Sequence, residues 1–557
     1  MMFNKQTLLF ILLLCIATIS CKKESIPFSN IINLKNSPSY PTEKGLNAFF
    51  DLGSWMGFSL SDDKTTTGFS GPYILGLEHG IWASNNFASL NLISENGNSL
   101  LTNLNYSEQD YFPGRLENQI TFEEINLKST LIFTSDKSLI ISTKITNNGN
   151  QNLEFIPQWK GEIFHQIGRL INNDTHLITL MEKGQKIYLN PISDEPFNIY
   201  SDSNKYVVSL KNDNLKPKET KTYSIEIQYH PDQKKSQKTI RKINISKAVE
   251  DNQLRWSKYL EITKNNSLSK EEKLILTKSI CTLINNWKSA AGALKHDGLF
   301  PSYHYKWFQG FWSWDSWKHA VALVKIDAEL AKNQVRAMYD YQNKDGMIAD
   351  CIFRDTTIEK HNWRDTKPPL SSWAIWEIYK ETQDTKFLKK MYPKLVNYHN
   401  WWYAFRDYDK DGLCEYGSTD GSLIAAKWES GMDNAIRFDK SKIVDGSNYS
   451  INTESVDLNS YLAKEKEYIA KMAKALKLSE YTKWEQEFNT LSDIIRNNFY
   501  DEKSGYFYDI DAETGEFLNS ALGPEGWTPI WCEIATKEQA DKVIEYMMDS
   551  TRFNTTV

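Results

Sequence analysis

Residues 131–150 read LIFTSDKSLIISTKITNNGN, and this stretch decides the fold of the first half of the chain. Two apolar runs, at 131–133 and 139–141, flank a short polar turn of Ser, Asp and Lys. This is the pattern of a β-hairpin. Apolar and β-branched residues then alternate from 141 to 145, and apolar residues alternate again from 223 to 229. A period of two indicates strands with one face in a core.

The region around this hairpin has no helical periodicity. We therefore expect residues 24–246 to form an N-terminal β-sandwich domain. The character of the sequence changes near Lys247. Residues 247–270 are polar and are predicted to form a helical linker, and the pattern from 271 onward is helical.

The second half of the chain contains consecutive segments with apolar residues at helical spacing. The clearest of them are 328–341, 395–402 and 462–476. Thr536 and Gln539 form a capping box before a further helix. Consecutive helices without intervening strands predict an all-α domain over 271–557.

The composition is that of a globular protein with many aromatic residues. The chain has 557 residues, a formal charge of −6, 40% hydrophobic and 24% charged residues. The lack of a basic excess excludes nucleic acid as an expected partner. Aromatic residues make up 13%, with 18 Trp. This content suits a protein that stacks on sugar rings, and it equally suits a large aromatic core.

The N-terminus resembles an export signal. Lys5 precedes an apolar run from 8 to 19, which is too short to span a bilayer and matches a signal peptide. Ser20 directly precedes Cys21, as at a bacterial lipoprotein cleavage site. We expect residues 1–20 to be removed and Cys21 to be lipidated. The protein would then be an envelope lipoprotein, in the periplasm or outer membrane, that meets the membrane only through this anchor.

Four further cysteines are widely spaced and form no C-x-x-C pair, which argues against a zinc site. We expect them to be buried free thiols. They are Cys281, Cys351, Cys414 and Cys532.

Two loop segments combine tryptophan with polar groups, as a sugar subsite requires. The alternative is that both loops pack into the helical core. The first segment is FQGFWSWDSWK at 308–318, and the second is NWRDTKPP at 362–369. The predicted substrate-binding residues are Trp312, Trp314, Asp315, Trp317, Lys318, Asn362, Trp363 and Lys367.

A third segment, KWESGMDN at 427–434, places Glu429 and Asp433 around a glycine turn beside Trp428. Glycoside hydrolysis needs a carboxylic acid that stays protonated, and an apolar neighbour favours that form. Either carboxylate could serve, or the segment could be a helix cap. A fourth segment, GPEGWTP at 523–529, carries Glu525 and Trp527, which we expect to line the pocket.

A fifth segment, DYDKDG at 407–412, has carboxylates at every second position before a glycine. Asp407, Asp409 and Asp411 have the spacing of Ca²⁺ ligands, although an EF-hand would need Glu where Ser418 stands. Clustered carboxylates without a cation are costly. We therefore predict bound Ca²⁺, with a solvated acidic turn as the alternative.

These segments, in this order, closely resemble the bacterial α-glucosidases of glycoside hydrolase family 63, whose relatives include trehalases and mannosylglycerate hydrolases. The resemblance covers about 270 to the end strongly and the β domain weakly. It implies a β-sandwich followed by an (α/α)6 barrel, and an inverting mechanism. It also implies that Asp433 rather than Glu429 is the acid, and that Asp407, Asp409, Asp411 and Glu454 bind Ca²⁺.

One part of the family pattern has no match. The catalytic base of the family is a Glu in the last helices of the barrel, and nothing after Asp433 matches its motif. We expect this base to lie beyond Val557, so that the barrel is incomplete and this chain has little activity of its own.

The resulting expectation is an exo-acting inverting α-glycosidase that releases terminal α-linked glucose and acts as a monomer. Two alternatives stay open. One is a non-catalytic carbohydrate-binding envelope lipoprotein, and the other is a trehalase or mannosylglycerate hydrolase specificity in the same fold.

Overall fold

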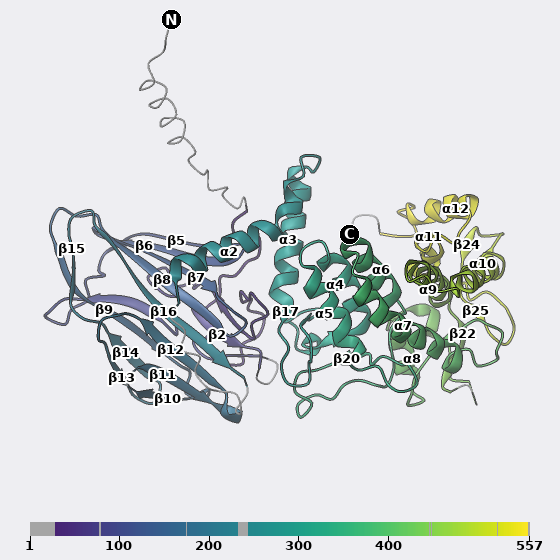
Figure 1. Ribbon diagram of the computed structural model, residues 1–557, viewed down its shortest axis with the longest axis horizontal. Coiled ribbons are helices and arrows are strands. Elements are labelled where there is room, and N and C mark those ends of the chain that lie inside the picture. The colour runs from purple at the N-terminus through teal and green to yellow at the C-terminus, as the bar shows by residue number, and fades with distance from the viewer. Residues whose placement is uncertain are drawn as a thin grey trace, which may run out of the picture.

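The computed structural model describes residues 28–76, 80–173, 175–231, 243–444, 446, 448–520 and 522–554. The molecule is elongated, with a β-sheet domain at one end and a helical region at the other (Figure 1). The predicted signal peptide and Cys21 lie outside the described residues. No helix in the described part of the chain has the length and apolar character needed to cross a membrane.

The N-terminal domain consists of antiparallel strands in three sheets. An eight-stranded sheet has the order β10-β11-β12-β16-β8-β7-β6-β5, and smaller sheets contain β13-β14-β9-β15 with β4, and β1-β2-β3. The strand bounds are β1 Met56–Ser59, β2 Ser70–Ile74, β3 Ile81–Trp82, β4 Ser89–Ile93, β5 Leu104–Phe112, β6 Arg115–Phe122, β7 Ile125–Phe133, β8 Ser138–Asn147, β9 Leu153–Glu162, β10 Gly168–Asn173, β11 His176–Met181, β12 Lys186–Ile192, β13 Asn198–Ser201, β14 Lys205–Ser209, β15 Asp213–Leu215 and β16 Thr220–His230.

The hairpin predicted from 131–141 is the centre of the large sheet. Strands β7 and β8 pair in register, with Phe133 opposite Leu139 and Leu131 opposite Ile141. Side chains from the two larger sheets meet in one core, as the Phe155 and Tyr223 rings, 6.1 Å apart, illustrate. The predicted β-sandwich class is confirmed, and the reason is the period-two pattern, which gives each sheet one apolar face.

The rest of the chain is helical, as predicted, with short two- to five-residue strands between helices. The helices are α2 Ile245–Tyr259, α3 Lys270–Asn286, α4 Ser313–Leu323, α5 Ala328–Tyr339, α6 Ser371–Thr382, α7 Thr385–Phe405, α8 Leu423–Glu429, α9 Val456–Ala475, α10 Tyr481–Asn498, α11 Thr528–Trp531 and α12 Lys537–Met547. The short strands used below are β19 Phe311–Trp312, β20 Cys351–Ile352, β21 Glu415–Gly417 and β22 Ser450–Glu454. Both halves of the predicted capping box at Thr536 and Gln539 are present.

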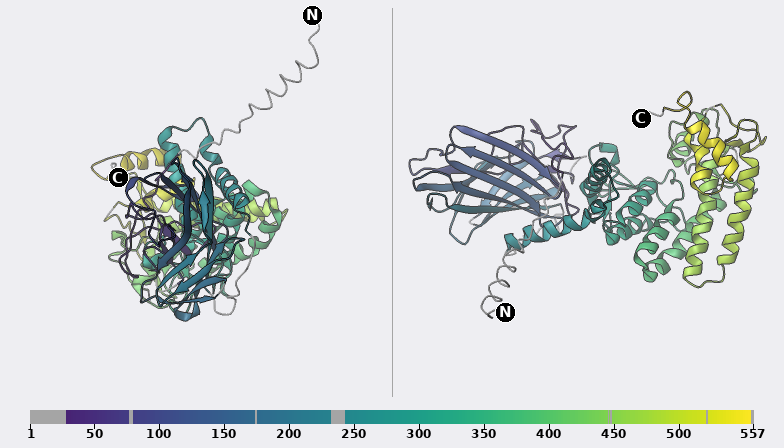
Figure 2. Two further views of the ribbon diagram at one scale, coloured as in Figure 1. Left: turned by 90° about the vertical axis from the view of Figure 1, so that its left-hand side faces the viewer. Right: turned by 90° about the horizontal axis from the view of Figure 1, so that it is seen from above.

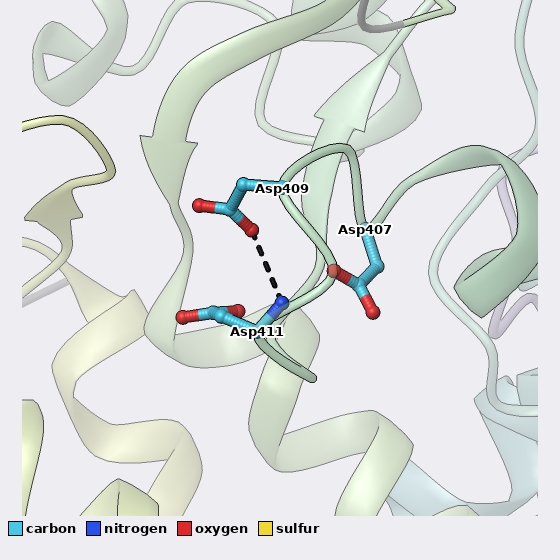
Figure 3. A group of neighbouring side chains, drawn as sticks. All are labelled: Asp407, Asp409 and Asp411. Atoms are coloured by element: carbon cyan, nitrogen blue, oxygen red, sulfur yellow. Dashed lines mark hydrogen bonds between the residues drawn. The ribbon is translucent and has the colours of Figure 1, made fainter.

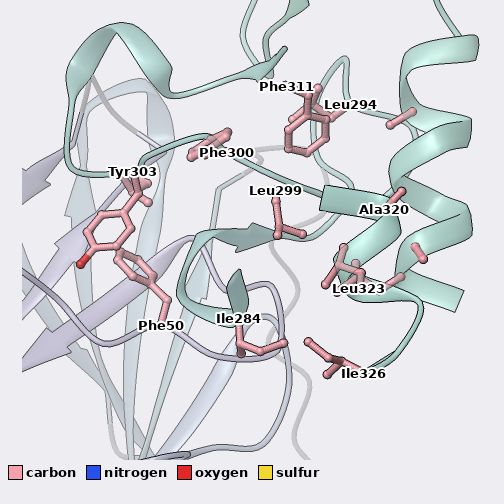
Figure 4. Packing of buried hydrophobic residues seen from close by; sticks show 14 of the residues in the cluster. Phe50, Ile284, Leu294, Leu299, Phe300, Tyr303, Phe311, Ala320, Leu323 and Ile326 are labelled. Atoms are coloured by element: carbon pink, nitrogen blue, oxygen red, sulfur yellow. The ribbon is translucent and has the colours of Figure 1, made fainter. Parts of the chain in front are cut away.

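The β domain and the helical region lie end to end (Figure 2). A continuous core of buried residues joins them (Figure 4). The Phe50 ring from the β domain lies 4.9 Å from that of Tyr303, and the Tyr303 hydroxyl donates to the carbonyl of Ala48 at 2.9 Å. Asp51 accepts two hydrogen bonds from Arg255 in α2, at 2.8 and 2.7 Å. These buried contacts hold α2 and the segment after α3 against the sandwich. The four cysteines predicted to be free are free and buried.

Candidate active site

The first tryptophan motif lies where β19 leads into α4. Strand β19 pairs with β20, so that Trp312 lies opposite Cys351 and the backbone NH of Ser313 donates to the carbonyl of Asp350 at 2.8 Å. Asp315 lies in the first turn of α4 and is within Coulomb range of Asp350. Burial raises the pKa of Asp315. The short strand pair thus brings together two carboxylates that are distant in the sequence.

Lys367 is the centre of a buried group of charges. Its Nζ lies 3.0 Å from Asp365 Oδ2 and 3.3 Å from Asp350 Oδ1, and it donates to the carbonyl of Trp428. Asn362 Nδ2 donates to both carboxylates, at 2.7 and 3.1 Å. Burial, followed by repulsion between the two carboxylates, raises the pKa of Asp365 to about 8, and burial raises the pKa of Asp350. This fixed set of donors and acceptors suits the hydroxyls of a sugar.

Asp433 stands on an exposed turn after α8. Its charge acts on both Asp350 and Lys367, so the turn faces the Lys367 group. Gly431 has φ +68, and a Cβ built on it would lie 2.4 Å from Cζ2 of Trp314. The turn therefore rests directly on the indole of the first motif, which joins the first and third predicted segments in one site.

Glu429 is not positioned to bind substrate, contrary to our prediction from the sequence. Its side chain is 0% exposed, and Arg406 binds it through Nε at 2.8 Å and Nη2 at 2.9 Å. The backbone NH groups of Gly417 and Thr366 donate to the same carboxylate at 2.6 and 3.3 Å. A carboxylate has about four acceptor positions, so none is left for a sugar hydroxyl.

The tryptophans of the predicted site divide into two classes. Trp317 is 0% exposed and packs against Tyr339 with ring centroids 5.7 Å apart, so it belongs to the core and our prediction that it binds sugar is wrong. The indoles of Trp312, Trp314, Trp363, Trp428 and Trp527 are partly exposed. Lys318 Nζ stands 3.2 Å from the centroid of the Trp314 ring, and the Arg364 guanidinium lies 5.0 Å from the Trp428 ring.

Glu525 belongs to a second buried group of charges, around Arg437. The guanidinium of Arg437 binds Asp457 at 2.8 Å and Asp509 at 3.1 Å. Burial raises the pKa of Asp509 to about 7 and also raises that of Glu525, whose strongest charge partner is Arg437. Arg437 Nη2 lies 3.9 Å from the sulfur of Met432, the residue before Asp433. The fourth predicted segment is thus connected to the turn that carries Asp433 through Arg437.

The three aspartates of the fifth segment form one cluster (Figure 3). One carboxylate oxygen from each of Asp407, Asp409 and Asp411 lies within 4.8 Å of the others. The backbone NH of Asp411 donates to Asp409 Oδ1 at 3.3 Å, which closes the loop. The strand pair β21–β22 places Glu415 opposite Glu454, next to this cluster.

The oxygens of this cluster fit a hard divalent cation. Asp407 Oδ1 and Glu415 Oε1 are buried and have no hydrogen-bond partner among the described residues. Burial, and then the charges of the three aspartates, raises the pKa of Glu454 to about 8. Buried carboxylate oxygens without donors are costly unless they coordinate a metal ion. The three predicted aspartates lie together, and Glu454 and Glu415 are within range of their charges. Glu415 was not among the ligands predicted from the sequence, and bound Ca²⁺ stays a prediction.

Several charged residues of the site were not singled out from the sequence. They are Asp350, Asp365, Arg406, Arg437, Asp457 and Asp509, all of them buried. A signal was present for two of them, because Asp350 follows the apolar run 347–349 and Asp509 follows the aromatic run 506–508. A charge that an adjoining apolar run carries into the interior must have a partner there.

Two cavities of about 320 and 390 Å³, both lined in part by Gly292, lie elsewhere, at the junction with the β domain. Trp55, Asp136 and Tyr229 line the first, and Arg354 and Asp355 line the second. None of the predicted site residues borders them.

Comparisons with known proteins agree with this division of the chain. Residues 308–557 match the mannosylglycerate hydrolase MGH1-like glycoside hydrolase domain, and residues 34–188 match the N-terminal domain of glucosidase YgjK. A mannosylglycerate hydrolase of Thermus thermophilus is 28% identical over 183 residues, which are 29% of this chain and 40% of that protein. The mannosylglycerate hydrolase MGH2 of Selaginella moellendorffii is 24% identical over 147 residues, or 23% of this chain and 28% of that protein.

Among solved structures, a GH63 mannosylglycerate hydrolase from Thermus thermophilus in complex with Tris matches with a TM-score of 0.41 and 18% identity, covering 48% of this chain and 76% of that one. The chain spans less than half the length of the curated relatives that it matches. The helical region is thus similar to the MGH1-like glycoside hydrolase domain and the β domain to the N-terminal domain of glucosidase YgjK, with distant similarity to mannosylglycerate hydrolases.

Proposed function

We propose that the protein is an exo-acting, inverting α-glycosidase with Asp433 as the general acid. The observation that carries the proposal is the position of Asp433, an exposed carboxylate on a turn that rests on Trp314 and faces the Lys367 group. A general acid must reach the glycosidic oxygen, and its position must be fixed. Glu429, the alternative, has every acceptor position occupied.

The remaining residues bind and orient the terminal sugar in this proposal. Lys367 and Asp315 hold its hydroxyls, and Trp314 and Trp428 offer apolar faces. Glu525 and Trp527 line the pocket next to Arg437. An inverting mechanism needs a second carboxylate about 6.5–9.5 Å from the acid to activate water. We assign this base to no described residue, because Asp350 and Asp365 are both held by Lys367.

We propose Ca²⁺ as the ion of the 407–411 loop, with Asp407, Asp409, Asp411, Glu415 and Glu454 as its ligands. A bound cation would supply the positive charge that these five carboxylates lack. The loop lies between α7 and β21, and β21 leads back towards Glu429. The ion therefore has a structural role in the proposal.

The substrate is proposed to be an α-linked glucoside with 1→2 or 1→3 linkage, and trehalose is one alternative. Mannosylglycerate is a second alternative, because several curated relatives are named for its hydrolysis. We also propose that the protein is a monomeric lipoprotein anchored through Cys21. Labelling of cells with a fatty-acid analogue tests the anchor: the label should appear on the protein and be absent from Cys21→Ala.

The test of the function is a panel of these sugars with the protein expressed from its longest reading frame, without residues 1–20, in Ca²⁺, with the released anomer followed by NMR. Release of the β-anomer from an α-linked substrate, abolished in Asp433→Asn, is the expected result. Turnover that persists in Asp433→Asn would remove the acid from this position. Sugar binding in calorimetry without turnover of any substrate would favour the carbohydrate-binding alternative.

A further inference from the structure

Glu429 receives hydrogen bonds from three separate segments of the site. Arg406 precedes the 407–411 loop, Gly417 ends β21 on the other side of that loop, and Thr366 precedes Lys367. Their donors reach the Glu429 carboxylate at 2.6–3.3 Å. The buried Glu429 carboxylate thus connects both ends of the 407–411 loop with the segment that carries Lys367.

Arg406 is itself held on every side. Its carbonyl accepts the backbone NH of Glu415 at 2.7 Å, and its guanidinium lies 4.9 Å from the Trp401 ring. A Cβ on Gly417 would lie 2.8 Å from Arg406 Nε, so the backbone approaches the guanidinium as closely as a glycine allows. Any shift of the 407–411 loop at either end would therefore move Arg406 or Gly417, which donate hydrogen bonds to Glu429.

In the sequence, Glu429 is followed directly by the turn that carries Asp433. It is the last residue of α8, Gly431 follows in contact with Trp314, and Asp433 comes two residues later. The carboxylates of the cation loop repel one another when no cation is present. If these carboxylates move apart, the shift would be transmitted through Arg406 and Glu429 to the Asp433 turn. Packed side chains with saturated hydrogen bonds move together.

We infer that Glu429 is a positioning residue that, with Arg406, couples cation binding in the 407–411 loop to the order of the Asp433 turn. This inference rests on the proposed function, since Asp433 is the group that is positioned. In this inference Glu429 transmits the effect of cation binding to the Asp433 turn and does not itself contact sugar.

The experiment is hydrogen exchange of the segment 428–434 in the full chain, with and without Ca²⁺, beside calorimetric titration of Ca²⁺. In the wild type, Ca²⁺ should slow exchange of this segment at least about fivefold. In Glu429→Gln, Ca²⁺ should still bind, with an affinity within about tenfold, but protection of 428–434 should be lost. Glu485→Gln, on an exposed position of α10, is the matched control and should behave like the wild type.

Arg406→Lys is the second variant, for the case that Glu429→Gln does not fold; it keeps the charge but loses the two-pronged contact. Full Ca²⁺-dependent protection of 428–434 in both folded variants would overturn the inference. Absence of such protection in a wild type that binds Ca²⁺, or absence of Ca²⁺ binding, would overturn it too. None of these readouts needs turnover, so failure of the proposed hydrolysis is distinguished from failure of the coupling.

Discussion

Gly431 packs directly against the indole of Trp314, so closely that a Cβ would lie 2.4 Å from its Cζ2. The backbone at Gly431 also has φ +68, a conformation that other residues adopt at a cost of roughly 1–2 kcal/mol. These two features together fix where the chain turns towards Asp433.

Gly431→Ala should therefore displace the turn that carries Asp433, the proposed acid. We expect loss of activity of about 10- to 100-fold, because small displacements of a catalytic group have effects of this size. Sugar hydrolysis and urea unfolding measure the effect. Gly515→Ala is the control, since Gly515 has φ +69 with nothing within 4 Å of a Cβ. If both variants lose stability but both keep activity, the contact with Trp314 does not position the acid.

Removal of Arg437 should destabilise the helical region strongly. Arg437→Met leaves Asp457 and Asp509 buried without their cation, and breaking a buried ion pair on one side costs about 3–5 kcal/mol. Arg552→Met, which breaks an ion pair whose two side chains are 43% and 36% exposed, should change stability by about 1 kcal/mol or less. Equal midpoints of urea unfolding for the two variants would contradict this view of the Arg437 group.

The stability of the metal-free protein should depend on pH through Asp365. Its folded pKa of about 8 lies above the ordinary value of 3.8, so the folded state keeps a proton that the unfolded chain releases above about pH 4. Stability therefore falls as pH rises from 4 to 8. Asp365→Asn should flatten this fall by up to about 1.4 kcal/mol per pH unit. Exposed Asp345→Asn is the control, and identical slopes in urea unfolding from pH 5 to 8 would refute the prediction.

Calcium should stabilise the protein, and its removal by a chelator should lower the melting temperature. A ligand at 100 times its dissociation constant adds about 2.7 kcal/mol to the stability of the folded state. Asp409→Asn and Glu415→Gln should each reduce this gain, because each removes a carboxylate from the cluster, while Asp345→Asn should not. A melting temperature that is the same in Ca²⁺ and in chelator would exclude a structural cation here.

The fold was largely predictable because its signals are local. The 131–141 hairpin and the Thr536 capping box depend on residues within a few positions of each other, and both are present as predicted. The 407–411 loop is local too, and its aspartates do form a cluster. Glu415 was missed because its place beside Glu454 depends on the pairing of β21 with β22.

The direction in which a side chain points was not predictable from the motifs. Trp314 and Trp317 belong to one motif and are three residues apart on α4, but Trp314, in the first turn, contacts Gly431 in the Asp433 turn and Trp317 is buried against Tyr339. From the sequence Glu429 is one of two candidate catalytic carboxylates, but in the structure Arg406 binds it. Contacts of this kind depend on residues far apart in the sequence, which no short motif records.

The junction between β22 and α9 has one linking residue, Ser455, and a carboxylate with a different task lies on each side of it. Glu454 faces the aspartate cluster, and Asp457 holds Arg437. One inserted residue would rotate Asp457 by about 100° around α9 and turn it away from its partner. Residues 454–457 should therefore accept substitutions more readily than insertions or deletions. During evolution their number would be conserved, because it sets the spacing between the two charge groups.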